Sequence, residues 1–367
     1  MAKEKERIYE ATDLALKNIA KNSFDDIFVS GQTKHWGDLI EFKLIKHQKL
    51  QNELLKQVRN DLIVALNDQK SKRPSCLNNY QKYQNPKRSG LYAYRQAALL
   101  EPKTTLAFLS LVILFAQKIE QKRIPVGENT VFSYRFEPNE VTGQIFSESE
   151  SLGFKGFRKE EFRQRANQKN NFVLSADISH FYDTLNLHVL ENELRDAADE
   201  DRFLAERVTR WLDRFLQQTD DGWSKGIPVG NNASRILAEA SLIGLDRRLK
   251  RTGINFIRFV DDFKIFTADP IEAQKALEIL NQELSKLGLA LNDSKVSLDQ
   301  ISDDSREKGQ ALLSGQEINI DQNDYLDRTP MTFRRTNKKS KGYEELVSKF
   351  TDAYSKYEVG GTFTEQN

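Results

Sequence analysis

The chain has 367 residues, of which 38% are hydrophobic and 30% charged, and this is enough for a sizeable core and two or three subdomains. Its formal net charge is only +1, so a nucleic-acid surface must come from local clusters and not from a global basic field. The single cysteine, Cys76, excludes an internal disulfide framework and the four histidines offer no zinc-ligand spacing, which fits a reducing cytoplasm.

Residues 1–75 are rich in Lys, Glu, Gln and Leu, and their apolar positions recur at helical intervals, so we expect a helical amino-terminal extension. The stretch 41–62 favours a solvated amphipathic helix that lies on the rest of the protein. The alternative is a coiled-coil helix that joins copies into a homo-oligomer. The first ten residues lack the apolar core of a signal peptide, and the apolar run 106–116 is too short to span a bilayer. We therefore expect a buried helix there and no membrane partner.

Between residues 69 and 103, basic residues and tyrosines are interleaved, and the only acid is Glu101. Basic side chains neutralise phosphates and tyrosine rings offer stacking surfaces for bases. This stretch is therefore the strongest nucleic-acid-binding candidate in the chain, and its cations include Lys87, Arg88 and Arg95. The alternative is a solvated loop with ordinary tyrosines.

An apolar strand is predicted at 172–176, and it ends in one carboxylate, Asp177, that is followed by the aromatic residues Phe181 and Tyr182. A helix follows at 187–216 with a break near Asp199. The next segment is a Gly-Ile-Pro-Val-Gly loop, 226–230, and it leads into a helix that reaches residue 250.

The stretch 255–267, NFIRFVDDFKIFT, is typical of a strand, a two-residue turn and a second strand, with Asp261 and Asp262 at the tip. Each ionised carboxylate beside a core costs several kcal/mol unless a cation compensates it. A divalent metal is the natural compensation. The alternative is an ordinary acidic turn, of the kind that we expect at Asp220-Asp221 and Asp303-Asp304.

After the hairpin we expect a helix at 270–287, because Pro270 is suited to its start and Gly288 to its end, and then a strand at 289–298. The predicted order is β-α-β-β-α-β, the split βαβ arrangement, in an α+β protein. Antiparallel pairing of the hairpin beside the first strand would bring Asp177 next to Asp261.

Taken in order, the strand ending in Asp177, the Gly-x-Pro-x-Gly loop and the aromatic-Val-Asp-Asp hairpin resemble the palm of reverse transcriptases, over roughly Tyr94 to Leu298. The resemblance implies a right-hand polymerase with a ferredoxin-like palm, helical fingers and a short helical thumb-like region. The expected divisions are a helical amino-terminal extension at 1–75, fingers at 76–170, a palm at 171–300 and a thumb-like region at 301–367.

The same resemblance implies a metal site and a catalytic lysine. Asp177, Asp261 and the carbonyl of Ile178 would hold two Mg²⁺ ions, and Asp262 would be an outer or alternate ligand. Lys295 matches the lysine that follows the hairpin in the family and would protonate or steady the pyrophosphate. The alternative for Lys295 is a solvated surface lysine.

The resemblance also assigns nucleotide-binding residues. Pro228, Val229 and Gly230 would back the template and the incoming nucleotide, and Arg95 would grip its triphosphate. Tyr182 would collide with a ribose 2′-hydroxyl and so select deoxynucleotides. Asp183 supports the alternative of an RNA-dependent RNA polymerase, because such enzymes place a second Asp at nearly this distance to bind that hydroxyl.

Two further basic segments are candidates for nucleic-acid contact. The segment 131–136 is similar to a fingers segment of the family, and its Arg135 would line the template path or else stand at the edge of a half-buried strand. The acid-free run 331–341 would clasp a duplex or a structured RNA. Its cations include Arg334, Arg335, Lys338 and Lys339.

The chain departs from the family pattern at three places. Val229 stands where many template-copying members carry Gln, and Asn231-Asn232 replaces the usual small residues and proline. Phe259-Val260 differs from the Tyr-Ala most typical of retron enzymes. These variants look most like bacterial antiphage or abortive-infection reverse transcriptases, which copy an associated noncoding RNA or extend DNA without a conventional template. We therefore expect an RNA-directed or template-independent DNA polymerase, with RNA, deoxynucleotides and a DNA product as partners. The alternative of another class is an RNA-binding scaffold with a vestigial palm.

Overall fold

The computed structural model describes residues 2–22, 48–68, 73–78, 81–86, 94–197, 202–217 and 224–314. Its helices are α1 (Ala2–Asn22), α4 (Gln48–Asn67), α5 (Pro102–Lys122), α6 (Gly153–Ala166), α7 (Phe181–Thr184), α8 (Leu187–Ala197), α9 (Arg202–Gln217), α10 (Asn232–Ser241), α11 (Ile243–Arg251), α12 (Pro270–Lys286) and α13 (Asp303–Leu313). The strands are β1 (Gln81–Pro86), β2 (Tyr94–Leu99), β3 (Phe136–Asn139), β4 (Gln144–Phe146), β5 (Phe172–Asp177), β6 (Phe256–Phe259), β7 (Asp262–Thr267) and β8 (Ser297–Gln300), and the 3-10 turns are η1 (Val126–Glu128) and η2 (Asp293–Lys295).

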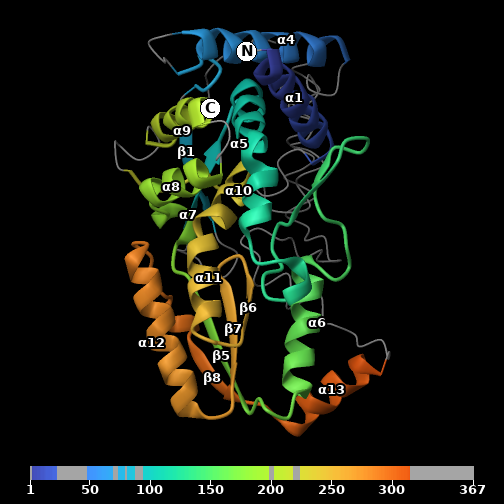
Figure 1. The fold of residues 1–367 in the computed structure, drawn as a ribbon, viewed down its shortest axis with the longest axis vertical. Coiled ribbons are helices and arrows are strands. Elements are labelled where there is room, and N and C mark those ends of the chain that lie inside the picture. The colour runs from blue at the N-terminus through green and yellow to red at the C-terminus, as the bar shows by residue number, and fades with distance from the viewer. Residues whose placement is uncertain are drawn as a thin grey trace, which may run out of the picture.

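A four-stranded antiparallel sheet, in the order β6-β7-β5-β8, occupies one end of the elongated molecule (Figure 1). Its inner strands β5 and β7 are apolar and mostly buried, whereas the edge strand β8 is polar and exposed along its length. Helix α12 packs on β5 and β7, and α6 packs on β6 and β7. The mixed helix and sheet content is the α+β class expected from the sequence, and the elements follow the predicted β-α-β-β-α-β order.

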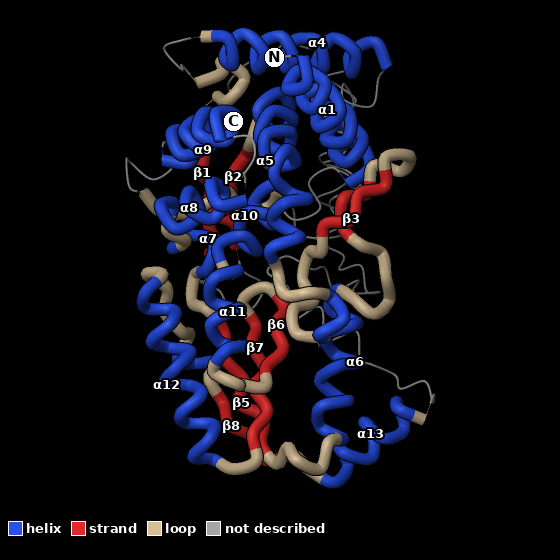
Figure 2. Tube along the Cα trace, viewed as in Figure 1, coloured by secondary structure: helices blue, strands red, loops and turns tan. Residues whose placement is uncertain are grey.

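The opposite end of the molecule is helical and is built around α5, which contacts α1, α4, α8 and α10 (Figure 2). Helix α5 has 21 residues and is longer than the apolar run 106–116 from which it was predicted. By length and composition alone it could cross a membrane. Most of it is buried by its neighbours in the protein. The predicted buried helix is therefore confirmed, while the expectation that it is too short to cross a bilayer was wrong.

Several predicted helices are confirmed where the chain is described. Residues 2–22 and 48–67 are helical, and α1 lies against α5 of the same chain. Helix α8 ends at Ala197 and α9 begins at Arg202, and the expected break near residue 199 lies outside the described residues. Helix α12 begins at Pro270 behind Asp269, whose side chain accepts hydrogen bonds from the amides of Ile271 and Glu272, and Gly288 follows it with φ of 73°.

One expectation on strands was wrong, and one pair of strands was not predicted. The strand predicted at 289–298 is instead the turn η2 and the short strand β8, because Ala290 and Asn292 are held by backbone hydrogen bonds beside the end of β5. The stretch 69–103 contains a hairpin, β1 and β2, which pair antiparallel. Its polar sequence lacks the apolar alternation by which a strand is recognised.

Helix α13 lies in a segment where the sequence shows no apolar periodicity, and it packs closely on α6. A Cβ atom at Gly309 would lie 2.3 Å from the carbonyl oxygen of Phe162 and 2.8 Å from Cβ of Ala166. The close approach of the two helices therefore depends on a glycine at this position.

We expect Gly309→Ala to lower the free energy of unfolding by about 1–3 kcal/mol, because the helices must separate, although a gain of up to about 1 kcal/mol in helix propensity offsets part of the loss. Equilibrium denaturation measures this change. Gly127→Ala is the control, since a Cβ there would meet no atom within 4 Å. A Gly309→Ala protein as stable as the control variant would contradict the close packing of α13 on α6.

Candidate active site

The hairpin of β6 and β7 presents the acidic pair. Phe259 and Asp262 are paired in the register, so the two-residue turn is Val260-Asp261 and Asp262 is the first residue of β7. The turn therefore lies one residue earlier than the acidic pair that the sequence placed at the tip. The side chain of Phe259 anchors the end of β6 against α6, with its ring centroid 5.5 Å from that of Phe154 and 6.0 Å from that of Phe157.

The third carboxylate comes from the end of β5. Asp177 is the register partner of Asp262, and the carbonyl of Asp261 accepts a hydrogen bond of 3.1 Å from the amide of Ile178. The prediction that pairing would bring the strand end to the hairpin is thus correct, although Asp262 and not Asp261 is the partner of Asp177 in the ladder. The structure brings together all four residues that the sequence assigned to the metal site.

The crowding of these carboxylates contributes to a raised pKa at Asp261. Burial is the largest cause, and together with the charges of Asp262 and Asp177 it raises the pKa of Asp261 from 3.8 to about 7. Asp177 itself is 5% exposed. Three acids at one place, one of which holds its proton near neutral pH, form a site that favours the arrival of positive charge.

Two side chains from the segment before β8 hold Asp177. Lys295 Nζ lies 2.7 Å from Asp177 Oδ2, and Asn292 Nδ2 donates to Oδ1 over 3.4 Å. The amide of Asn292 also donates to the Asp177 carbonyl over 2.8 Å. The lysine predicted to act in the site is therefore there. Asn292 was missed, and its only signal is its position three residues before Lys295.

The loop 226–230 is joined to the aromatic pair that follows Asp177. The amide of Ile227 donates to the carbonyl of Tyr182 over 2.8 Å, and the ring of Tyr182 is 5.6 Å from that of Phe181. Pro228 is buried, and its carbonyl accepts a hydrogen bond of 2.9 Å from Asn231, the residue that caps α10. Val229 and Gly230 are half-buried. The loop and Tyr182 therefore form one connected unit next to β5.

The carboxylates have the donor atoms that a divalent cation prefers, but they are not arranged as a complete set of ligands. Among the described residues, no group of three or more His, Cys, Asp or Glu side chains stands ready as a ligand cage. The ammonium of Lys295 occupies one oxygen of Asp177, Oδ2, so a cation would compete with it for that oxygen. The donors are the hard oxygens that magnesium prefers, and a cation would relieve the repulsion that raises the pKa of Asp261. Asp177, Asp261 and Asp262 therefore fit such an ion in the chemistry of their donor atoms.

Arg135 does not lie where a template would pass. It is 4% exposed, its Nε is 3.1 Å from Glu120 Oε1, and its Nη2 donates to the carbonyl of Ile124 over 2.5 Å. Burial, followed by the charge of Arg123, lowers the pKa of Arg135 to about 10. The structure therefore corrects its assignment to nucleic-acid binding, because a guanidinium this deeply buried and paired does not reach a phosphate.

The remaining nucleic-acid candidates are not tested by the structure. Arg95 lies on β2 opposite Asn85, and only its backbone is described. The others lie outside the described residues, and they are Lys87, Arg88, Arg334, Arg335, Lys338 and Lys339.

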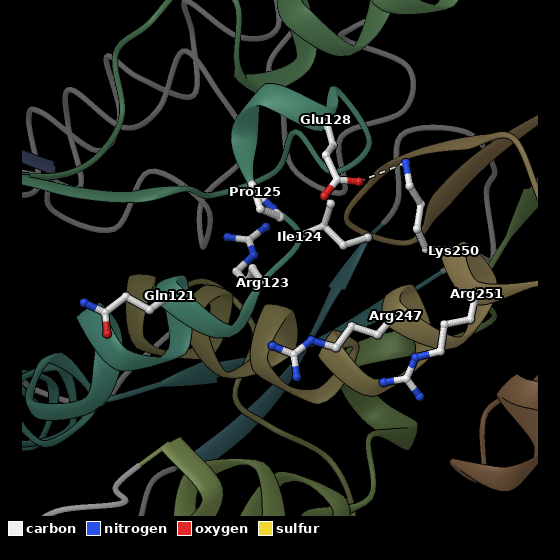
Figure 3. A pocket seen from close by; sticks show the side chains of 8 residues that line it. All are labelled: Gln121, Arg123, Ile124, Pro125, Glu128, Arg247, Lys250 and Arg251. Atoms are coloured by element: carbon white, nitrogen blue, oxygen red, sulfur yellow. Dashed lines mark ion pairs between the residues drawn. The ribbon is translucent and has the colours of Figure 1, made fainter. Parts of the chain in front are cut away.

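A pocket of about 410 Å³ lies between the end of α5, the turn η1 and α11 (Figure 3). It is lined by Gln121, Arg123, Ile124, Pro125, Glu128, Arg247, Lys250 and Arg251. Lys250 pairs with Glu128 at 3.1 Å, and Arg247 donates to the carbonyl of Lys122. Arg123 pairs with Glu239, so three of the lining cations already have partners in the protein and the pocket carries no assignment of a ligand.

Behind the hairpin lies a buried ion cluster that sequence reasoning missed. The guanidinium of Arg258 on β6 contacts Asp246 Oδ2 at 2.6 Å and Glu239 Oε2 at 3.0 Å, and Arg123 contacts the same Glu239 oxygen at 2.7 Å. The available signal was a charged residue inside an apolar run, namely Arg258 within FIRFV and Glu239 within ILAEASL.

One family model matches the chain. The family model described as "Reverse transcriptase (RNA-dependent DNA polymerase)" matches residues 116–310, which include all three carboxylates, the loop 226–230 and Lys295. No curated protein matches the chain significantly.

Solved structures similar to the chain include yeast telomerases. The apo telomerase of Candida tropicalis truncated from its C-terminal domain is 18% identical, with a TM-score of 0.42, over 61% of this chain and 50% of that one. The telomerase of Candida albicans in complex with the TWJ fragment of telomeric RNA is 14% identical, with a TM-score of 0.41, over 70% of this chain and 48% of that one. The chain thus spans about half the length of these structures. The family match covers more than half of the chain, and the chain belongs to the reverse transcriptase family.

Proposed function

We propose that the protein is an RNA-directed DNA polymerase that joins deoxynucleotides by two-metal phosphoryl transfer. The observation that carries this proposal is the meeting of Asp177, Asp261 and Asp262 at the end of one hairpin, where burial and the charges of the other two acids raise the pKa of Asp261 to about 7. Three crowded acids destabilise a turn that has only a structural role, whereas a phosphoryl-transfer site needs them as ligands for cations.

Each residue of the site has a role in this proposal. Asp177, Asp261 and the carbonyl of Ile178 would hold two magnesium ions, with Asp262 as an alternate ligand, and the ions would supply charge stabilisation for the attacking hydroxyl and the leaving pyrophosphate. Lys295, whose Nζ lies 2.7 Å from Asp177 Oδ2, would donate to the pyrophosphate.

The proposed nucleotide-binding residues include the unit formed by the loop 226–230 and Tyr182. Pro228, Val229 and Gly230 back the template and the nucleotide, since the loop is hydrogen-bonded to Tyr182 beside β5. Arg95 grips the triphosphate. Residues 1–75 form an extension, 76–170 the fingers, 171–300 the palm and 301–367 a thumb-like region. Nucleic acid is held by basic residues of the fingers and the thumb-like region, namely Lys87, Arg88, Arg334, Arg335, Lys338 and Lys339.

We also propose that the protein acts in antiphage defence in the bacterial cytoplasm, with a dedicated noncoding RNA as partner. Val229 and Phe259-Val260 support this, because they depart from the residues of template-copying and retron enzymes. In bacteria that express the protein, phage plating should fall with the wild type and not with Asp177→Asn. Equal plating with both proteins would contradict the defence role while leaving the polymerase activity intact.

The polymerase proposal is tested by incorporation of labelled deoxynucleotides, with Mg²⁺ and with EDTA, using the nucleic acid that copurifies with the protein and a defined RNA template with a DNA primer. We expect incorporation only with Mg²⁺. Retained RNA binding without any incorporation, with or without added template, would favour the scaffold with a vestigial palm.

Selection of the sugar is a separate expectation that concerns Tyr182. If its ring lies under the sugar, Tyr182→Ala removes a clash, and ribonucleotide use should rise relative to deoxynucleotide use by a factor worth about 1–3 kcal/mol. Incorporation of each nucleotide type by wild type and variant, at matched folded fraction, measures the factor. Phe181→Leu is the control, since Phe181 is 3% exposed and packs in the core. A wild-type preference for ribonucleotides would instead favour the RNA-polymerase alternative, with Asp183 as the sugar-binding residue.

A further inference from the structure

The turn that carries Asp261 has a backbone conformation that needs support. Val260 has φ of 56°, in the left-handed region, where a β-branched residue is strained by about 1–3 kcal/mol. Such a residue persists only where its surroundings hold it in place. Because Val260 is covalently joined to Asp261, any relaxation of its backbone would move the carboxylate.

One side chain holds the Val260 peptide directly. Arg258 Nη1 donates to the carbonyl of Val260 over 2.7 Å. The Arg258 side chain is fully buried, and its own backbone is fixed separately, since its amide donates to Thr130 and its carbonyl accepts from Phe132. The backbone of Arg258 is therefore held in the strand without its side chain. The conformation of the Val260 turn, in contrast, depends on the Arg258 side chain.

The guanidinium is in turn oriented by two carboxylates from different helices. Nε and Nη2 donate to Asp246 of α11 over 2.8 and 2.6 Å, and Nη2 donates to Glu239 of α10 over 3.0 Å. Burial works against the charge of Arg258, but Asp246 and Glu239 outweigh it and raise its pKa above the ordinary value. The same guanidinium contact helps to lower the pKa of Glu239 in spite of its burial. The fork of Arg258 is therefore charged and fixed in direction.

Stability alone does not account for this cluster. Buried ion pairs are often no more stabilising than apolar side chains of similar volume, because desolvation offsets the attraction. A guanidinium, however, supplies several donors in a rigid planar fork, so it can bind two carboxylates and still present one N–H to a carbonyl. A lysine, with its donors on one nitrogen, cannot span the three positions.

We propose that Arg258 is a positioning residue for the catalytic hairpin: its contact with the Val260 carbonyl, oriented by Asp246 and Glu239, holds Asp261 and Asp262 in register with Asp177. The inference rests on the proposed polymerase function for its effect on catalysis. Its structural part does not, because the amide of Ile178, which donates to the Asp261 carbonyl over 3.1 Å, reports the position of the turn directly.

The test compares Arg258→Lys with Arg123→Lys at matched folded fraction. Arg123 also contacts the side chain of Glu239. Its hydrogen bonds to the backbone, however, go to the carbonyls of Ser133 and Tyr134 and not to the hairpin. We expect Arg258→Lys to lower kcat about 10- to 100-fold, because a small displacement of the carboxylates is costly, and to raise the Mg²⁺ concentration for half-maximal activity. The KM for deoxynucleotide should stay within about threefold. Arg123→Lys should lower stability and leave kcat unchanged.

Hydrogen exchange gives a readout without catalysis. Arg258→Lys should speed exchange at the amide of Ile178 and in peptides that span 256–267, while exchange in α12 stays as in the wild type. If Arg258→Lys does not accumulate as folded protein, Asp246→Asn replaces it, and a smaller loss of kcat with faster exchange at Ile178 is expected.

Wild-type kcat and wild-type exchange at Ile178 in Arg258→Lys, or in Asp246→Asn where that variant is used, would overturn the positioning role. Equal losses of kcat in Arg258→Lys and Arg123→Lys, in proportion to their stability, would also overturn it. A wild-type protein that incorporates no nucleotide would instead overturn the polymerase proposal, and the exchange comparison would still decide whether Arg258 holds the turn.

Discussion

Asp261→Asn is expected to abolish nucleotide incorporation without unfolding the protein. The substitution removes a metal ligand, so we expect kcat to fall at least about a hundredfold, more than the 10- to 100-fold usually lost with an outer partner of a metal ligand. It also removes one of three mutually repelling carboxylates, so stability in metal-free buffer should not fall. Incorporation assays and thermal melting in EDTA measure the two effects. Wild-type rates from Asp261→Asn would exclude the two-metal assignment.

The pH dependence of stability gives the same residue a second test. The pKa of Asp261 is raised from 3.8 to about 7 in the folded protein, so the unfolded chain loses this proton first as pH rises. The contribution of Asp261 to stability therefore falls between about pH 4 and pH 7, by roughly 2–4 kcal/mol at most, since the side chain is only half-buried and water screens it. It is regained as the pH falls through that window.

Urea unfolding in EDTA at pH 5 and pH 8 measures this contribution as a difference between proteins. Asp261→Asn should lose less stability than the wild type between the two pH values. Asp299→Asn is the matched control, because Asp299 lies exposed on β8 of the same sheet, and it should behave as the wild type. Mg²⁺ should reduce the wild-type dependence by binding the ionised form. Identical pH profiles for wild type and Asp261→Asn would contradict the raised pKa.

The second large effect is expected at Phe263, which follows Asp262 on β7. Its side chain is fully buried, its ring is 6.1 Å from that of Phe256, and the guanidinium carbon of Arg258 lies 6.0 Å from its centroid. Phe263→Ala leaves a cavity between the sheet and the ion cluster, so we expect a loss of about 3–5 kcal/mol in the free energy of unfolding.

Equilibrium denaturation tests this loss, with Leu298→Ala as the control. Leu298 lies on β8 of the same sheet and is 43% exposed, so its truncation should cost less than about 1 kcal/mol. Incorporation by Phe263→Ala should also fall, beyond the loss of folded protein, because Asp262 is its neighbour. Similar losses of stability in the two variants would show that the sheet core is not centred on Phe263.

Sequence by itself determined the family, the acidic residues of the candidate site and the helix after the hairpin. Asp177 stands at the end of an apolar run, Asp261 and Asp262 adjoin another, and Pro270 and Gly288 delimit α12. These features are local, because periodicity, turn residues and caps act over a few neighbouring positions, and a sequence displays them directly.

Only the tertiary structure decided which distant residues meet. Asp177 is joined to Lys295 across 118 positions, and the ladder makes Asp262 its partner where the sequence suggested Asp261. No local pattern encodes such contacts, because they depend on how the sheet and helices pack. The same reason explains why the burial of Arg135 and Arg258 was not predicted. A cation in a sequence predicts exposure, and only the carboxylates that pack around each arginine offset the free-energy cost of burying its charge.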